Sequence, residues 1–450
     1  MGWTYRINEL AETVGATPVG ADTTFTAVST DTRKLAPGEV FFALSGENFD
    51  GNQYAGQAIE KGAAAVVTSQ SVDGPCLVVD DPLAALQAFA AHHRARFDIP
   101  LVAITGSVGK TTSKDLIAGA LGTRYRVIKT EGNFNNEIGC PLSLLQIDDE
   151  TDIAVIEMGA TRLGNIAELC GIARPSESAI TRIVPAHLEG FGSIENVERT
   201  KGEIAETLPG DGVFYVNTDD TACLRAAERF SGRKVRYGSA GDVTLRSCAF
   251  NEAGEMVVDI DPVGQMTLPL ASRDLTTNVL LALAIGLQHG VTEFEAGLRG
   301  VTISAGRLRV FDLNGVTIID DTYNANPAST EAALRALMER PGSGARMAVL
   351  GDMLEMGPES AGIHRSVGEQ AAEMGVGRLF TYGPHGSDTI AGARAAGLTE
   401  AAAFDGHAVL AESIRQAVRP GDVLLVKGSR GMRMETVIEA LRTAEAQHTD

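Results

Sequence analysis

The stretch AITGSVGKTTSK, residues 103–114, decides the fold of the middle of the chain. An apolar strand signal over Leu101–Thr105 runs directly into two glycines, and a helix signal begins near Lys110. Gly106 and Gly109 allow the backbone to turn sharply, so that N–H groups and the start of the helix face an anion. The sequence therefore predicts a strand, a phosphate-binding loop and a helix, in that order.

The loop differs from the common G-x-x-x-x-G-K-[ST] pattern, because Ile104 stands where the first glycine of that pattern belongs. Lys110 supplies a positive charge for the β- and γ-phosphates of a nucleotide, and Thr111 supplies a hydroxyl that can reach Mg²⁺. The terminal phosphate could be hydrolysed as a switch, passed to a hydroxyl, or used to make a bond. The residues expected to hold the triphosphate are Gly106, Ser107, Val108, Gly109, Lys110, Thr111 and Thr112.

Strand signals continue to alternate with glycine loops and helix signals beyond this loop. Strands are predicted over Asp152–Met158, Ser178–Val184 and Gly212–Asn217, and a helix over Glu195–Leu208. Such alternation is typical of a largely parallel sheet with helices on both faces. Residues 243–269 alternate in hydrophobicity at every second position, which predicts an antiparallel addition to that sheet.

The chain of 450 residues is long enough for several domains. We expect three α/β domains: a small N-terminal α/β domain over residues 1–98, a central phosphate-loop ATPase domain with a mostly parallel sheet over 99–308, and a Rossmann-like C-terminal domain over 309–450. In the first, residues 39–44 and 63–68 read as buried strands on either side of a helix over 55–62.

Composition narrows the classes of function. The net charge of −20 argues against general binding to nucleic acid or to membrane surfaces, because both require basic faces. The five cysteines are scattered and form no C-x-x-C pair, which favours buried thiols over disulfides or a zinc site. No apolar signal core opens the chain and no apolar run reaches 18 residues, so we expect a cytoplasmic protein without membrane insertion.

Polar residues follow several of the predicted strands. Glu157 ends a buried strand, where a carboxylate is costly unless it meets a cation such as nucleotide-bound Mg²⁺. His187 follows the third strand, although a lone histidine is more often structural than catalytic. Lys201 lies on the next helix, and an exposed lysine is its default interpretation; a lysine carbamylated by CO₂ would instead offer anionic oxygens to a metal.

A second set of residues could hold a nucleotide from the opposite side. Asn278 lies on a predicted helix, Arg307 lies near the second domain boundary, and DDTYNANP spans Asp320–Pro327 after a strand. Asp321 could accept ribose hydroxyls, and Arg307 could lie along the phosphates. Turn chemistry alone would also explain the Asn-Ala-Asn-Pro segment, so both interpretations stay open.

Together these motifs resemble the Mur ligases of peptidoglycan synthesis, and the resemblance covers nearly the whole chain. It rests on AITGSVGKTT, TEGNFNNEIGCPLSLL, VIEMGA, AHLEGFGS, KGEI, IIDDTYNANP, VLGDMLEMG and KGSRGMRME, and on STDTRKLAPGEVFFALSGENFDG near the N-terminus. The glycine loop is shared with folylpolyglutamate-type ligases. GNFNNEIG, PGEVFFAL and the DDTYNANP–GDMLEMG pair are more specific, and they resemble the branch that joins D-alanyl-D-alanine to UDP-N-acetylmuramoyl-tripeptide.

The resemblance implies a reaction and a set of site residues. ATP would phosphorylate the terminal carboxylate of the tripeptide, and the amine of D-alanyl-D-alanine would displace phosphate from the acyl phosphate. The small N-terminal domain would bind the UDP moiety, the C-terminal domain would bind the dipeptide and part of the nucleotide, and the protein would act as a monomer. Two Mg²⁺ sites are implied. The implied residues are Lys110, Thr111, Glu157, His187 and carbamylated Lys201 for metal and catalysis; Asn278, Arg307, Asp321 and Asn324 for the nucleotide; Ser29, Asp31 and Arg33 for UDP; Asn133, Asn135 and Asn136 for the muramoyl-peptide; and Asp352, Lys427, Ser429 and Arg430 for the dipeptide.

Three positions depart from the family pattern: Arg182-Ile183-Val184 replaces Asn-x-Gly, Asn52 replaces a histidine, and Cys140 replaces an aliphatic residue. None of these removes a group that the chemistry needs. The alternatives are another ATP-dependent amino-acid ligase, a nucleotide-hydrolysing switch or kinase, and an inactive binding or scaffold protein. The short loop, and a following strand that ends in Glu157 instead of aspartate, argue against the switch or kinase.

Overall fold

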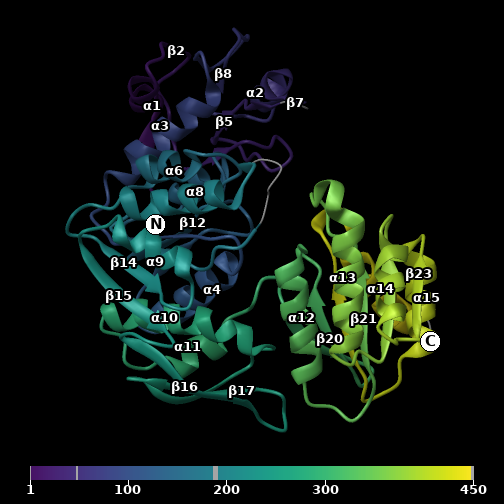
Figure 1. Cartoon of the computed structure of the whole chain (residues 1–450). Coiled ribbons are helices and arrows are strands. Elements are labelled where there is room, and N and C mark those ends of the chain that lie inside the picture. Colours follow the sequence, from purple (N-terminus) through teal and green to yellow (C-terminus); the bar gives the residue numbers. More distant parts are fainter. Residues whose placement is uncertain (1, 47–48, 186–190, 447–450) are drawn as a thin grey trace.

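The computed structural model describes residues 2–46, 49–185 and 191–446. Three large sheets lie within this part of the chain. Figure 1 shows the N-terminal part, in purple to blue, above the teal central part, with the green to yellow C-terminal part beside the central one. Each sheet is mostly parallel and packs against helices, which confirms the predicted α/β class. The domain boundaries at 98/99 and 308/309 stay predictions.

The N-terminal sheet has the strand order β2-β9-β8-β5-β4, and only the β2–β9 pair within it is antiparallel. Its two central strands are fully buried and lie where the sequence predicts them, with helix α2 between them in the chain. The elements are α1 (Ile7–Val14), β2 (Pro18–Val19), β4 (Val28–Ser29), β5 (Val40–Phe42), α2 (Ala55–Glu60), β8 (Ala65–Thr68), β9 (Cys76–Val78) and α3 (Pro82–Arg94), with small pairs β1 (Tyr5–Arg6) with β3 (Thr24–Phe25) and β6 (Ser45–Gly46) with β7 (Phe49–Asp50).

The central sheet has the order β11-β12-β10-β13-β14-β15-β16-β17-β18. Pairing is parallel from β11 through β16 and antiparallel from β16 to β18, which confirms the antiparallel addition predicted for residues 243–269. Its strands are β10 (Leu101–Thr105), β11 (Val127–Lys129), β12 (Ile153–Glu157), β13 (Glu177–Ile180), β14 (Val213–Asn217), β15 (Arg233–Gly238), β16 (Val243–Phe250), β17 (Met256–Asp261) and β18 (Gly264–Leu268). Its helices are α4 (Lys110–Leu121), α5 (Gly139–Leu144), α6 (Asn165–Ala173), α8 (Ile194–Glu206), α9 (Thr221–Glu228), α10 (Thr276–Gln288) and α11 (Glu295–Arg299).

Strand register explains the residue that departs from the usual loop pattern. Ile104 is fully buried in β10 and pairs with Glu157 at the end of β12. The neighbouring strand therefore brings the carboxylate to the same sheet edge as the phosphate loop. A glycine at position 104 would weaken a central strand, since glycine there has no side chain to pack.

The predicted strand over Ser178–Val184 is wrong in its extent, because β13 ends at Ile180. The chain leaves the sheet there and runs along the phosphate loop, where Ser107 N–H donates to Arg182 O at 2.8 Å. The apolar residues that suggested a longer strand lie in this segment, where Ile183 is buried.

The C-terminal sheet has the order β19-β20-β24-β21-β22-β23, parallel except for the antiparallel edge strand β19. The carboxyl ends of β20, β24 and β21 therefore lie side by side. Its elements are β19 (Arg309–Leu313), β20 (Val316–Asp321), α12 (Pro327–Glu339), β21 (Arg346–Gly351), α13 (Ser360–Glu373), β22 (Arg378–Tyr382), α14 (Gly386–Ala395), β23 (Ala401–Phe404), α15 (His407–Ala417), β24 (Val423–Lys427) and α16 (Glu435–Ala446).

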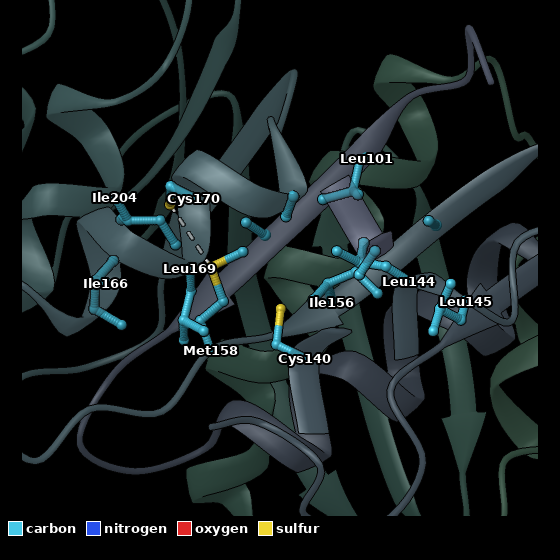
Figure 2. Close-up of a cluster of buried hydrophobic side chains, with 14 of the residues drawn as sticks. Leu101, Cys140, Leu144, Leu145, Ile156, Met158, Ile166, Leu169, Cys170 and Ile204 are labelled. Carbon is cyan, nitrogen blue, oxygen red and sulfur yellow. Dashed lines mark hydrogen bonds between the residues drawn. The ribbon is translucent and has the colours of Figure 1, made fainter. Parts of the chain in front are cut away.

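Figure 2 shows the apolar cluster that packs against β10 and β12, with side chains from α5, α6 and α8. Cys140 and Cys170 are buried in this cluster as free thiols, and Cys170 Sγ lies 3.6 Å from Met158 Sδ. Burial raises the pKa of the Cys170 thiol to about 12. The prediction of buried thiols is confirmed for four of the five cysteines, whereas Cys248 is partly exposed.

Among the helices of the described residues, none combines the length and the apolar character that a bilayer-spanning segment requires.

Candidate active site

A cavity of about 650 Å³ lies where the carboxyl ends of the central strands meet the C-terminal part of the chain. Most of the residues predicted to bind nucleotide or substrate lie on its wall, although they come from distant parts of the sequence. The predicted residues that line it are Gly106, Ser107, Val108, Gly109, Lys110, Thr112, Asn133, Asn135, Asn136, Glu157, Lys201, Asn278, Arg307, Asp321, Asn324 and Lys427.

The two glycines of the phosphate loop adopt conformations that other residues rarely reach. Gly106 has φ 148° and Gly109 has φ 83°. A Cβ atom on Gly106 would lie 2.1 Å from Thr181 Oγ1, and one on Gly109 would lie 2.8 Å from Asn278 Nδ2. Both positions therefore require glycine for backbone shape and for space.

The loop is held in shape by the segment that follows β13. Ser107 N–H donates to Arg182 O at 2.8 Å, and Ser107 Oγ donates to Val184 O at 2.8 Å. Thr181 Oγ1 donates to Val108 O at 2.6 Å. These hydrogen bonds fix the loop backbone from one side, and the loop and the N-terminus of α4 line the cavity.

Lys110 is the first residue of α4 and folds back over the loop. Its Nζ donates to Gly106 O at 2.8 Å. Burial lowers the pKa of Lys110, and the nearby Glu157 carboxylate opposes part of that shift. A phosphate in the loop would give this ammonium an anionic partner.

Two buried oxygen atoms beside the loop have no hydrogen-bond partner among the described residues: Thr111 Oγ1 and Glu157 Oε2. Glu157 is 1% exposed, and its other carboxylate oxygen accepts a hydrogen bond from Asn135 Nδ2 at 2.7 Å. The amide of Glu157 donates to Thr130 Oγ1 at 2.9 Å, which fixes the strand end. Burying such oxygens without partners is costly, and a cation bound to either of them would offset that cost.

Lys201 is buried on α8, so the default expectation of an exposed lysine is wrong. Its side chain is 4% exposed and its Nζ lies 5.9 Å from the centre of the Phe191 ring. Burial, together with the positive charge of Lys110, lowers the pKa of Lys201 to about 7. A substantial fraction of this amine is therefore neutral at neutral pH.

The opposite wall of the cavity contains Asn278 and Arg307. Asn278 Nδ2 donates to Gly109 O at 3.1 Å and to Ser113 Oγ at 2.8 Å, which ties α10 to the start of α4. The Arg307 guanidinium lies 4.0 Å from the centre of the Tyr323 ring. Stacking on the ring holds the guanidinium at the cavity wall while leaving its N–H groups available for an anion.

Asp321 and Lys427 form an ion pair at the ends of neighbouring strands β20 and β24. Lys427 Nζ lies 2.5 Å from Asp321 Oδ2, and Asp321 Oδ1 accepts from Leu308 N–H at 3.1 Å. Lys427 Nζ also donates to Asn324 O at 2.8 Å. Both residues line the cavity, but each is already engaged, so neither presents an unpaired charge to it.

Comparison with known proteins identifies the family. The Mur ligase middle domain matches residues 104–286, the Mur ligase glutamate ligase domain matches 306–430, and the Mur ligase family catalytic domain matches 24–94. UDP-N-acetylmuramoyl-tripeptide–D-alanyl-D-alanine ligase of Escherichia coli (strain K12) is 37% identical over 97% of this chain and 98% of its own. The chain belongs to the Mur ligase family.

Solved structures of Mur ligases share the complete architecture. The MurF crystal structure from Acinetobacter baumannii superimposes with a TM-score of 0.89 at 29% identity, covering 98% of this chain and 99% of its own. MurF ligase from Thermotoga maritima in complex with ADP gives a TM-score of 0.83 at 28% identity, covering 94% and 98% of the two chains. This Mur ligase therefore has the three-domain α/β fold of the MurF structures.

Several predicted residues lie away from the cavity. Ser29 Oγ donates to Asp31 O at 3.0 Å in the N-terminal part, and hydrogen bonds from Arg33 lower the pKa of Asp31 to about 2. In the C-terminal part, Asp352 and Ser429 are buried. The structure does not bring these residues to the cavity, and neither does it bring Arg430, whose exposed guanidinium pairs with Glu435 at 3.1 Å. His187 lies outside the described residues.

Sequence reasoning missed residues that shape this Mur ligase site. Thr181 clamps the loop, Thr130 fixes the strand that ends in Glu157, and Tyr323 carries Arg307. Thr181 is the first residue after β13, and Tyr323 is the second residue after β20. A search for polar residues just after predicted strands could have found both. Thr130 also directly follows a strand, β11, but no strand was predicted at that place, so the same rule could not find it.

Proposed function

We propose that this protein is an ATP-dependent amide ligase that joins D-alanyl-D-alanine to UDP-N-acetylmuramoyl-tripeptide, giving ADP, phosphate and the UDP-muramoyl-pentapeptide. One observation carries the proposal: the phosphate loop and Glu157 line one cavity, and among the described residues neither Glu157 Oε2 nor the buried hydroxyl of Thr111, which follows Lys110, has a hydrogen-bond partner. The name of the Escherichia coli relative and the ADP bound to the Thermotoga maritima structure support it.

The chemistry explains why a ligase needs such a phosphate site. A carboxylate is a poor acylating group, because it is anionic and would have to expel oxide. An oxygen of the tripeptide carboxylate attacks the γ-phosphorus and ADP leaves; the dipeptide amine then attacks the carbonyl carbon, loses a proton, and phosphate leaves. Lys110 lies where it would offset the negative charge that gathers in the first step.

The residues beside the loop suit Mg²⁺. Thr111 Oγ1 and Glu157 Oε2 are hard oxygen donors without a partner in the part of the chain that the structure describes, and Mg²⁺ usually adds only one or two such groups to phosphate and water ligands. No group of three or more His, Cys, Asp or Glu side chains that could hold a metal occurs among the described residues, which fits a metal held partly by the nucleotide. Bound Mg²⁺ would neutralise phosphate charge. A second metal would involve His187 and carbamylated Lys201.

The environment of Lys201 supports carbamylation. A neutral amine attacks CO₂ through its nitrogen lone pair and then loses a proton, and the lowered pKa of Lys201, about 7, provides that neutral amine. We expect Lys201→Ala to lose activity and to recover part of it when a small carboxylate is added. Absence of any recovery, in a variant that still folds and binds nucleotide, would count against the carbamate.

The remaining assignments follow the same proposal. Residues 1–98 would bind UDP through Ser29, Asp31 and Arg33, residues 99–308 would bind ATP, and residues 309–450 would bind the dipeptide. Asn133, Asn135 and Asn136 line the cavity near Glu157 and would contact the muramoyl-peptide. A cytoplasmic location and a monomeric state stay predictions.

Phosphate release tests the proposed function directly. We expect release from Mg-ATP only when both UDP-N-acetylmuramoyl-tripeptide and D-alanyl-D-alanine are present, with the pentapeptide product detected by mass spectrometry. Release that is unchanged when either substrate is omitted would indicate a nucleotide-hydrolysing protein instead. Activity with a single amino acid in place of the dipeptide would indicate another ligase of this family.

A further inference from the structure

The segments that follow β20, β24 and β21 are joined into one edge beside the cavity. Lys427 Nζ donates to Asn324 O at 2.8 Å, and Ser429 Oγ donates to Ala325 O at 3.3 Å. Ser429 N–H donates to Asp352 O at 3.1 Å. The edge therefore includes three of the four residues proposed for the dipeptide, Asp352, Lys427 and Ser429. Of the five residues in these contacts, Lys427 and Asn324 line the cavity.

His364 reaches this edge from helix α13. Its side chain is 2% exposed, and its Nε2 accepts a hydrogen bond from Met353 N–H at 2.9 Å. Its Nδ1 lies 2.7 Å from Ser360 O, which can only accept, so Nδ1 carries the proton. The ring is therefore a neutral imidazole whose acceptor nitrogen is used to hold a backbone amide.

The residues on either side of Met353 are held as well. The Asp352 carboxylate accepts from His385 N–H at 2.9 Å, and Leu354 N–H donates to Ser429 Oγ at 2.9 Å. The Leu354 side chain is 44% exposed. Three consecutive residues thus have a fixed backbone, and the last of them presents an apolar side chain outward.

A small void of about 10 Å³ lies beside this segment. Met353, His364 and Lys427 all line the void, and Lys427 also lines the 650 Å³ cavity. A displacement of the Met353 backbone would therefore change the shape of the void that Lys427 lines.

We propose that His364 is a positioning residue for the dipeptide: through the Met353 amide it fixes residues 352–354 in the conformation that receives D-alanyl-D-alanine beside Lys427. This inference rests on the proposed function. His364 is not among the residues that line the cavity, so we expect its effect to be confined to the amine substrate.

Two substitutions separate the acceptor role from the other contacts of the ring. His364→Gln places an amide oxygen near the Nε2 position and can still accept from Met353 N–H. His364→Asn places its amide near the Nδ1 position, retains the contact with Ser360 O and leaves the Met353 amide unpaired. We expect His364→Asn to raise KM for D-alanyl-D-alanine about ten-fold, since an unpaired buried amide favours rearrangement of the segment. His364→Gln should remain within about two- to three-fold of the unsubstituted protein.

The same assay supplies the controls. KM for ATP and for UDP-N-acetylmuramoyl-tripeptide should not change in either variant. Arg365→Ala is the matched control, because Arg365 is the next residue of α13, is exposed, and lies 3.9 Å from Asp388 at the surface. We expect Arg365→Ala to leave all three KM values unchanged.

An equal rise in all three KM values in His364→Asn, or no rise for the dipeptide, would overturn the proposal, as would equal behaviour of the Gln and Asn variants. If His364→Asn does not fold, amide exchange in the unsubstituted protein replaces it: Met353 N–H should be strongly protected, and rapid exchange there would overturn the proposal. Failure of the proposed function is recognised separately, because the unsubstituted protein would then show no dipeptide-dependent phosphate release.

Discussion

At the scale of single residues, the site gathers groups whose burial makes them costly without a ligand. Lys201 is a buried amine near the positive charge of Lys110, and Glu157 has a buried oxygen without a partner among the described residues. Such groups destabilise the free protein and become favourable when an opposite charge arrives. The free protein is therefore less stable than it would be without these groups, and ligand binding removes part of that destabilisation.

Lys201→Met should stabilise the free protein in a pH-dependent way. The pKa of Lys201 is lowered from 10.5 to about 7, so between these values the unfolded chain binds more protons than the folded one. The free energy of unfolding of the unsubstituted protein therefore falls as the pH decreases from about 10 to about 7, and falls no further from this source below that. In buffers free of CO₂, the gain in Tm of Lys201→Met should be larger at pH 7 than at pH 10. An equal gain at both values would contradict the burial of a free amine.

Glu157→Gln should weaken the response to Mg²⁺. The substitution keeps size and the hydrogen bond with Asn135 but removes the charge from the buried carboxylate. We expect activity to fall about 100-fold or more and half-saturation to require more Mg²⁺. Glu168→Gln, at an exposed pair with Arg162, is the control and should match the unsubstituted protein in both respects. An unchanged Mg²⁺ requirement in Glu157→Gln would remove Glu157 from the proposed metal site.

At the scale of elements, the phosphate loop is fixed by its neighbours more than by its own residues. The segment after β13 holds the loop backbone on one side, and α10 reaches the start of α4 through Asn278. The loop therefore depends on two elements that are far away in the sequence. Its glycines are needed because those neighbours approach so closely.

Gly106→Ala tests this close approach. The added Cβ would lie 2.1 Å from Thr181 Oγ1, at a φ that L-residues rarely adopt. We expect a loss of about 1–3 kcal/mol in the free energy of unfolding and a higher KM for ATP. Gly171→Ala is the control, because a Cβ at this position in α6 meets nothing within 4 Å; it should be neutral or slightly stabilising. Denaturant titration compares the two, and similar losses in both would refute the steric argument.

At the scale of the whole molecule, the proposed substrate sites do not share one continuous wall. The cavity is lined by the central and C-terminal parts, whereas Ser29, Asp31 and Arg33 lie outside it. A reaction between substrates held on different parts requires those parts to approach one another.

Solution scattering should detect this approach. We expect the radius of gyration to decrease when a non-hydrolysable ATP analogue, UDP-N-acetylmuramoyl-tripeptide and D-alanyl-D-alanine are all bound. The nucleotide analogue alone provides the comparison for a partial change. Identical dimensions with and without the complete set of ligands would argue against closure.

Strand-end chemistry made much of the site predictable from sequence. The phosphate loop and Glu157 follow apolar strands of one parallel sheet, and parallel strands place their carboxyl ends at one edge. The ion pair between Asp321 and Lys427 was not predictable, because the two residues are 106 positions apart and only the sheet order joins them. The burial of Lys201 was equally hidden, since its helix pattern is compatible with an exposed position. The predicted extent of β13 was wrong because the apolar residues after Ile180 belong to the segment that contacts the phosphate loop and not to the strand.

The clamp on the phosphate loop has a consequence for the thermodynamics of ligand binding. Three hydrogen bonds from Ser107 and Thr181 hold the loop backbone before any nucleotide arrives. Little conformational entropy is then lost when a phosphate settles into the loop, so affinity depends mainly on the electrostatic and hydrogen-bond complementarity of the ligand. Rigid phosphate mimics shaped to this loop should therefore gain as much binding affinity from their contacts with it as the flexible triphosphate does.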